Sequence, residues 1–179
     1  MPYSRGVTTN QGENIKSAIS TAVRTARWKP AALLAVVLGI LSFVSGPTAP
    51  LGFFWRPAPG FPTPSPVQLP LFIGLGLAEA ITFGLGISFL FFGYPMVRPI
   101  YPASTTLTRL AHFCIASLLF SWWPHDSLHI HVGEASVNGL LAIEYAFHVT
   151  LMIAGVILAY FFLTLVRQAD QRGSSQLRG

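Results

Sequence analysis

Long apolar segments alternate with shorter polar or proline-rich segments along most of this chain. Four apolar segments stand out, at residues 31–46, 71–92, 106–123 and 139–166. A helix needs about 20 residues to cross the hydrocarbon of a bilayer, and it satisfies its backbone hydrogen bonds within its own segment. The pattern therefore predicts an all-α integral membrane protein, with a four-helix bundle over residues 30–166.

The first 29 residues are polar and basic, but part of this tail has an amphipathic pattern. Ile15 and Ile19 recur at helical spacing, opposite Lys16 and Arg24. This arrangement predicts a helix that lies on the membrane surface with its basic side chains against anionic headgroups. The alternative is a tail without regular structure. A second basic tail is expected at residues 167–179.

The positions of Lys and Arg predict how the chain is oriented. Most of them lie in the two tails, and the connection after the second segment adds Arg98 and Arg109. The proline-rich stretch 47–70 contains only Arg56, and the stretch 124–138 contains no Lys or Arg. Since basic connections stay cytoplasmic, both termini are expected in the cytoplasm and both stretches on the opposite face. We expect a prokaryotic plasma membrane, because the tail has no transit-peptide pattern.

Composition narrows the function classes. The chain is 52% hydrophobic and only 9% charged, which is outside the range of soluble globular domains. A net charge of +5 could indicate nucleic acid, but nucleic-acid binding needs a basic stripe on a folded soluble face. We therefore expect the lipid bilayer as partner and no nucleic acid. The single cysteine, Cys114, excludes an intramolecular disulfide.

Ionisable residues are concentrated in one part of the chain. Residues 121–148 hold four of the five histidines and three of the six acidic residues. The expected loop at 124–138 contains His125, Asp126, His129 and His131, which are nitrogen and oxygen ligands within seven residues. Such ligands suit Fe, Cu or Zn, so this loop is a candidate metal site.

A second candidate set lies inside the apolar segments. Glu79, His112 and His148 are nine to eleven residues from the expected extracytoplasmic boundaries, which is roughly 14–17 Å deep at 1.5 Å per residue. Glu144 lies one helical turn from His148. Ionisable groups within spans usually mark a site or a pathway. The leading hypothesis is therefore a membrane metalloprotein of redox or oxygenase type, with the metal held by either set.

Three other interpretations remain open for these residues. His112 and His148 could be the axial ligands of a b-type haem in an electron-transfer subunit. The loop histidines could lie at headgroup level without a ligand, or could sense pH. Glu79 and His112 could simply form hydrogen bonds that hold helices together.

Small residues recur every four positions on two of the segments and predict close helix packing. They are Gly76, Ala80 and Gly84 on the second segment, and Ala142 and Ala146 on the fourth. The stripe on the fourth segment is expected to meet a second copy of the chain or another membrane subunit. A non-catalytic subunit of a larger membrane complex is thus a further hypothesis.

Overall fold

The computed structural model describes residues 28–47, 49–54, 56–60, 62–101, 103–132 and 136–176. Within these ranges the chain is helical and contains no strand. The elements are α2 (Trp28–Ser45), η1 (Gly52–Phe54), α3 (Leu69–Phe92), α4 (Tyr94–Val97), α5 (Thr105–Phe120), α6 (Trp122–Val132), α7 (Val137–Glu144), the π-helical turn η3 (Tyr145–Val149) and α8 (Thr150–Gln176). The expected amphipathic surface helix and most of the N-terminal tail lie outside the described residues.

Three helices of the described chain are long and apolar enough to cross a membrane. They are α2, α3 and the continuous helix formed by α7, η3 and α8. Their large apolar side chains are mostly exposed, for example Leu33, Leu71 and Val156. Exposed apolar surface of this extent is expected where lipid is the solvent. The all-helical class and a location in a bilayer are thus supported, whereas α5, with 16 residues, is shorter than a full span.

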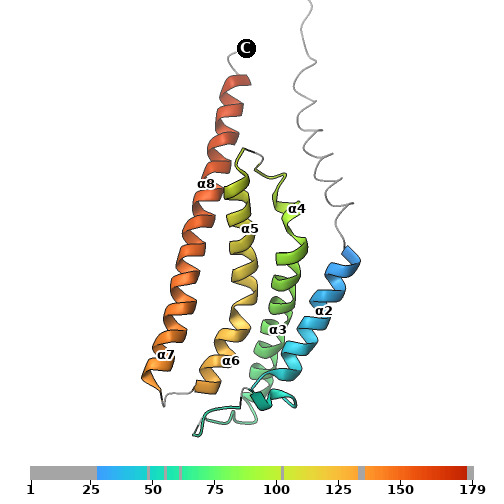
Figure 1. The fold of residues 1–179 in the computed structure, drawn as a ribbon, viewed down its shortest axis with the longest axis vertical. Helices are drawn as coiled ribbons and strands as arrows, with labels where there is room; N and C mark the ends of the chain where they lie inside the picture. Colours follow the sequence, from blue (N-terminus) through green and yellow to red (C-terminus); the bar gives the residue numbers. More distant parts are fainter. Residues whose placement is uncertain are drawn as a thin grey trace, which may run out of the picture.

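The helices lie side by side in a row (Figure 1). α2 packs on α3, α3 packs on α5, and α5 packs on α8. The row places α2 and α8 at its two edges, so a closed four-helix bundle is not confirmed. α6 continues α5 at one end of the row, where it contacts both α3 and α7.

Small residues bring α2 and α3 into close contact. A Cβ atom added at Gly84 would lie 2.2 Å from the carbonyl oxygen of Ala35. Ser88 Oγ donates a hydrogen bond to the carbonyl oxygen of Ala31 at 2.7 Å, and Ala80 is fully buried. Because the backbones meet directly, van der Waals contact is made without long side chains.

The other residues of the predicted stripes have different surroundings. An added Cβ at Gly76 would meet no atom within 4 Å. Ala142 and Ala146 are exposed on α7 and η3. These three positions therefore face away from the described chain.

Serine caps begin two of the helices near the predicted places. Ser104 Oγ accepts from the backbone N–H of Leu107 at 3.2 Å, and Ser136 Oγ accepts from that of Gly139 at 3.2 Å. Each cap satisfies one of the free N–H groups at a helix start. At its other end α8 continues to Gln176, past the expected limit at residue 166, and the sequence there contains no proline to end it.

The expected histidine loop is instead the helix α6, so the prediction of a loop at 124–138 is wrong for residues 124–132. Pro124 lies in the first turn of α6, where a missing N–H does not weaken the helix. Pro124 cannot donate to the carbonyl of Phe120, and its ring crowds that carbonyl. The helical path therefore breaks at Ser121, and the histidines follow on a separate helix.

We predict that Gly84→Leu destabilises the protein by about 1–3 kcal/mol, because the side chain would overlap the backbone of α2. Thermal unfolding in detergent would measure the loss. Gly76→Leu is the matched control, since the same change on the same helix meets open space. Equal melting temperatures for the two variants would contradict this account of the α2–α3 contact.

Candidate functional site

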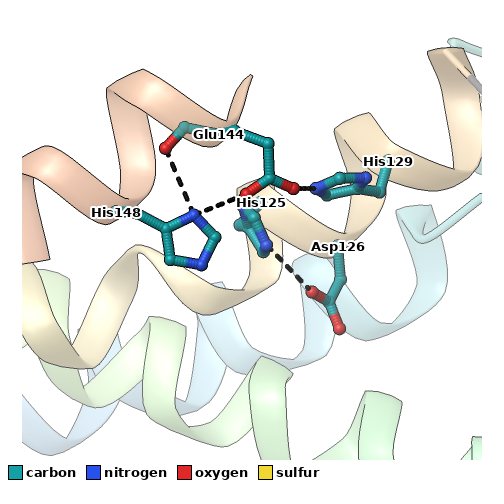
Figure 2. Close-up of polar contacts among 5 residues, drawn as sticks. All are labelled: His125, Asp126, His129, Glu144 and His148. Atoms are coloured by element: carbon teal, nitrogen blue, oxygen red, sulfur yellow. Dashed lines mark hydrogen bonds and ion pairs between the residues drawn. The ribbon is translucent and has the colours of Figure 1, made fainter. Parts of the chain in front are cut away.

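Two helices bring three histidines and one glutamate together at one end of the row. His125 and His129 lie one turn apart on α6, while Glu144 ends α7 and His148 belongs to η3. Figure 2 shows the carboxylate of Glu144 between the rings of His129 and His148, with His125 beside them. We refer to these four residues as the His–Glu cluster.

The carboxylate of Glu144 bridges the two helices. Its Oε1 lies 3.1 Å from Nε2 of His129, and its Oε2 lies 2.6 Å from Nδ1 of His148. Both distances allow an imidazole N–H to donate to the carboxylate. The His148 Nδ1 also lies 3.2 Å from the backbone oxygen of Glu144. One carboxylate thus orients two imidazole rings from different elements.

His125 is the buried member of the cluster. Its side chain is 11% exposed, whereas those of Glu144 and His148 are 45% and 49% exposed. Its ring stacks on Phe147, with 3.9 Å between ring centroids and 21° between planes, and it lies 4.5 Å from the ring of His129.

One atom of this ring has no hydrogen-bond partner. Among the described residues, Nδ1 of His125 is a buried side-chain nitrogen without a donor or acceptor in contact. A buried polar atom without a partner is unfavourable by about 1–3 kcal/mol. Such an exception in a native fold calls for a physical explanation, and a bound ligand is one of the usual ones.

Asp126 connects this site to α3. Its Oδ1 lies 4.0 Å from Nε2 of His125, and its carboxyl group adjoins that of Glu79 on α3. Asp126 therefore lies between the His–Glu cluster and α3.

The proline-rich loop packs against the last turn of α6. His131 Nδ1 lies 3.0 Å from the backbone oxygen of Arg56, and the N–H of Ala58 donates to the carbonyl of Ile130 at 3.0 Å. These bonds place the loop and the histidines at the same end of the row, as the charge pattern predicted. His131 therefore faces the loop rather than the His–Glu cluster.

The predicted common level of Glu79, His112, Glu144 and His148 is not observed for His112. Its Nε2 lies 2.9 Å from the backbone oxygen of Phe89, near the opposite end of α3. The prediction placed the end of the third segment at Trp123, but the helical path continues to Val132 and moves His112 away from that end.

The position of His112 also tests the alternative in which His112 and His148 are the two axial ligands of a haem. His112 and His125 are thirteen residues apart along α5 and α6, a rise of roughly 20 Å. Since the rings of His125 and His148 are 5.6 Å apart, His112 and His148 lie at different levels. Axial ligands bind a haem iron from its two opposite faces, and the structure does not place these two imidazoles in such an arrangement.

Two aromatic residues of the site were not predicted. Phe147 is 8% exposed and packs on both His125 and Trp122, whose ring lies 5.0 Å from it. The π-helical turn that contains Phe147 adds a residue to one turn and directs neighbouring side chains toward α6. Nothing in the sequence marks such a turn, although π turns often occur at functional sites.

The donor set of the cluster is three imidazoles and one carboxylate, which suits Fe, Cu(II) or Zn. In the part of the chain that the structure describes, no group of three His, Cys, Asp or Glu side chains already has metal-binding geometry. One nitrogen of His129, Nε2, and one of His148, Nδ1, are directed at Glu144. A metal would require a change of side-chain rotamers within the cluster.

Comparison with known proteins assigns no relationship: no family model, curated protein or solved structure matches the chain.

We predict that Glu144→Gln changes the protonation pattern of the cluster histidines. A carboxamide has one acceptor oxygen and a donor NH2 group, so at most one of His129 and His148 can keep an N–H directed at it. Nitrogen-15 NMR of histidine-labelled protein would show the tautomer change. His112 is the internal control, because its partner is a backbone oxygen of Phe89. Unchanged signals from both cluster histidines would refute the bridge.

Proposed function

We propose that this chain is a membrane metalloprotein that binds one transition-metal ion through the His–Glu cluster. His125, His129 and His148 are its imidazole ligands, and Glu144 is either the fourth ligand or the group that orients two of them. The observation that supports this proposal is the meeting of three imidazoles around one carboxylate at the junction of α6 and α7.

The two sets of candidate ligands contribute to a single site in this proposal. His125 and His129 come from the segment that was expected to be a loop, and Glu144 and His148 come from the last apolar segment. Asp126, Glu79, His131 and His112 have other partners and are not ligands in the proposed site.

One feature of the cluster supports this proposal: His125 holds a buried nitrogen without a hydrogen-bond partner. Glu144 can accept the N–H of a ligand histidine, which is the usual second interaction of metal-binding imidazoles.

The proposed activity is of redox or oxygenase type. Three imidazoles with a carboxylate can hold a redox-active ion and leave a coordination position for a substrate. His148 and Glu144 are the exposed members and would border that position. Bound iron or copper would supply the electron-transfer chemistry, while the protein supplies the orientation of the rings, with Phe147 packed between His125 and Trp122.

The membrane topology is part of the same proposal. α5 and α6 together provide a fourth crossing between α3 and α7, which places both chain ends on one side. The basic residues of the tails make that side the cytoplasm. The His–Glu cluster then belongs to the extracytoplasmic half of the protein.

We predict that the purified protein contains about one transition-metal ion per chain, and that His129→Ala/His148→Ala removes it. Mass spectrometry of detergent-purified protein that has never contacted an affinity-column metal would measure the content. An absorption spectrum of the same sample would reveal any bound haem.

His112→Ala and His131→Ala are matched controls, because each removes an imidazole whose partner is a backbone oxygen elsewhere. Both are expected to keep the metal. A folded double variant with undiminished metal content, or wild-type protein without metal, would refute the proposed function.

A second candidate function is that of a non-catalytic subunit in a larger membrane complex. The observation that favours it is the row of helices, which leaves the apolar faces of α3 and α8 open instead of enclosing them. The exposed alanines Ala142 and Ala146 would allow another helix to approach α7 and η3 closely.

This second function predicts that Ala146→Leu reduces the size of the native assembly, since the larger side chain would block close approach. Native gel electrophoresis of solubilised membranes would show the shift. Ala159→Leu, at an exposed position farther along α8, is the control. An unchanged assembly in Ala146→Leu, or loss of assembly in both variants, would contradict the use of this face.

A further inference from the structure

α2 and α3 leave an apolar groove on one side of their contact. Its volume is about 310 Å³, which is at the small end of the range for ligand clefts in proteins. Gly39 and Ala80 lie where the two helices meet, and their small size leaves the space between the rims open. The side chains along the two rims are apolar and half-exposed: Val36 and Ile40 on α2, and Ile81 and Leu85 on α3. Since α2 forms an edge of the row, the groove can be reached from the surrounding lipid (Figure 1).

One end of the α2–α3 pair has residues that are typical of a membrane boundary. α2 begins with Trp28 and Lys29, both exposed, and aromatic and basic side chains are enriched where the bilayer meets water. α3 ends on the same side, at Phe92. The hydrogen bond from Ser88 to the carbonyl oxygen of Ala31 holds these two helix ends at one level.

The groove begins some distance below that boundary. On α2 it extends from Ala35 to Phe43, which is roughly 9–21 Å from Lys29. On α3 its near end is Leu85, roughly 10 Å from Phe92. Both helices therefore give the same depth for the near end. This depth lies inside a hydrocarbon layer of about 30 Å, wherever the opposite boundary falls along α3.

The dimensions of the groove suit a single hydrocarbon chain. Over its length of roughly 12 Å, a volume of about 310 Å³ corresponds to a mean cross-section of roughly 26 Å². A helix with its side chains is about 10–12 Å across and needs roughly 80–110 Å². The groove is therefore too narrow for a helix of another subunit. An acyl chain is unbranched and runs across the layer in the same direction as the two helices.

A positive charge lies at the boundary end of the same helix face. Lys29, Val36 and Phe43 are seven residues apart, or almost two turns each, so they share one face of α2. None of the ion pairs within the described chain involves Lys29. An anionic headgroup at this level gains an electrostatic contact, while its acyl chain follows the face inward to the groove.

We infer that the α2–α3 groove is a binding site for one anionic phospholipid. One acyl chain lies between the rims of the groove, and the phosphate of the headgroup lies at Lys29. The inference does not rest on the proposed metal site, since no residue of the His–Glu cluster lines the groove.

The headgroup contact is tested by native mass spectrometry of the detergent-purified full chain. Dioleoyl phosphatidylglycerol and dioleoyl phosphatidylcholine are added separately, so that the acyl chains are the same and only the headgroup differs. We expect one phosphatidylglycerol per chain, bound at a concentration roughly fivefold lower than phosphatidylcholine. Lys29→Gln should remove this difference. Arg98→Gln, which neutralises an exposed basic residue on another helix, should preserve it.

The acyl-chain contact is tested by a pair of neighbouring variants in the same experiment. Ile40 lines the groove and Leu41 does not, although the two residues are similarly exposed, at 59% and 52%. Ile40→Trp should therefore raise the concentration needed for both lipids by roughly tenfold, with their ratio unchanged. Leu41→Trp adds the same bulk about 100° around the helix and should alter neither lipid.

Each contact has an outcome that overturns it. Equal binding of the two lipids to the wild-type chain, or an unchanged preference in Lys29→Gln, refutes the headgroup contact. Equal effects of Ile40→Trp and Leu41→Trp on binding refute the acyl chain in the groove. A dimer mass that is lost in Ile40→Trp while lipid binding persists would assign the groove to a second copy of the chain and overturn the inference.

Discussion

The carboxylate of Glu144 is the interaction on which the candidate site depends. It accepts from His129 of α6 and from His148 of η3, and these elements belong to different segments of the chain. Without it the two imidazoles would have no common partner, and the end of α6 would be tied to α7 mainly by the ring contacts of Phe147. Partly exposed contacts of this kind add little stability, so their main effect is on geometry.

Two irregularities in otherwise regular helices make this arrangement. Pro124 ends the regular hydrogen bonding of α5 and starts α6 on a new axis. The π-helical turn then adds one residue to the facing helix and turns Phe147 and His148 toward α6. Each irregularity removes backbone hydrogen bonding locally, and side-chain contacts across the α6–α7 junction compensate for it.

Much of the fold could be predicted because apolar length alone indicates a membrane helix. α2 and α3 begin and end within a few residues of the predicted limits, and Gly84 lies at the close contact that its spacing indicated. The spacing alone does not predict which helix packs against the small residues of α3. Gly76, on the same stripe, has no neighbour because α2 ends before reaching it.

The residues of the site could be predicted from the sequence, but their arrangement in space could not. Glu144 and His148 were paired correctly by their four-residue spacing, which keeps them on one face even across the π turn. His112 was assigned the wrong level, because the polar composition of residues 124–132 resembles a loop although these residues form a helix. Whether such a segment is helical depends on tertiary contacts with α3, α7 and the proline-rich loop, which local sequence does not specify.

Most ionisable groups of the described chain are paired, and Nδ1 of His125 is an exception. In the described part of the chain, Glu79 meets Asp126, Glu144 meets two imidazoles, and His112 and His131 meet backbone oxygens. Each of these contacts gives a polar group a partner, which lowers the free-energy cost of burying that group in apolar surroundings. His125 is different, because aromatic rings surround it while its buried Nδ1 has no partner. The buried Nδ1 of His125 is therefore the polar atom of the described site whose hydrogen-bonding capacity a partner from outside the chain could satisfy.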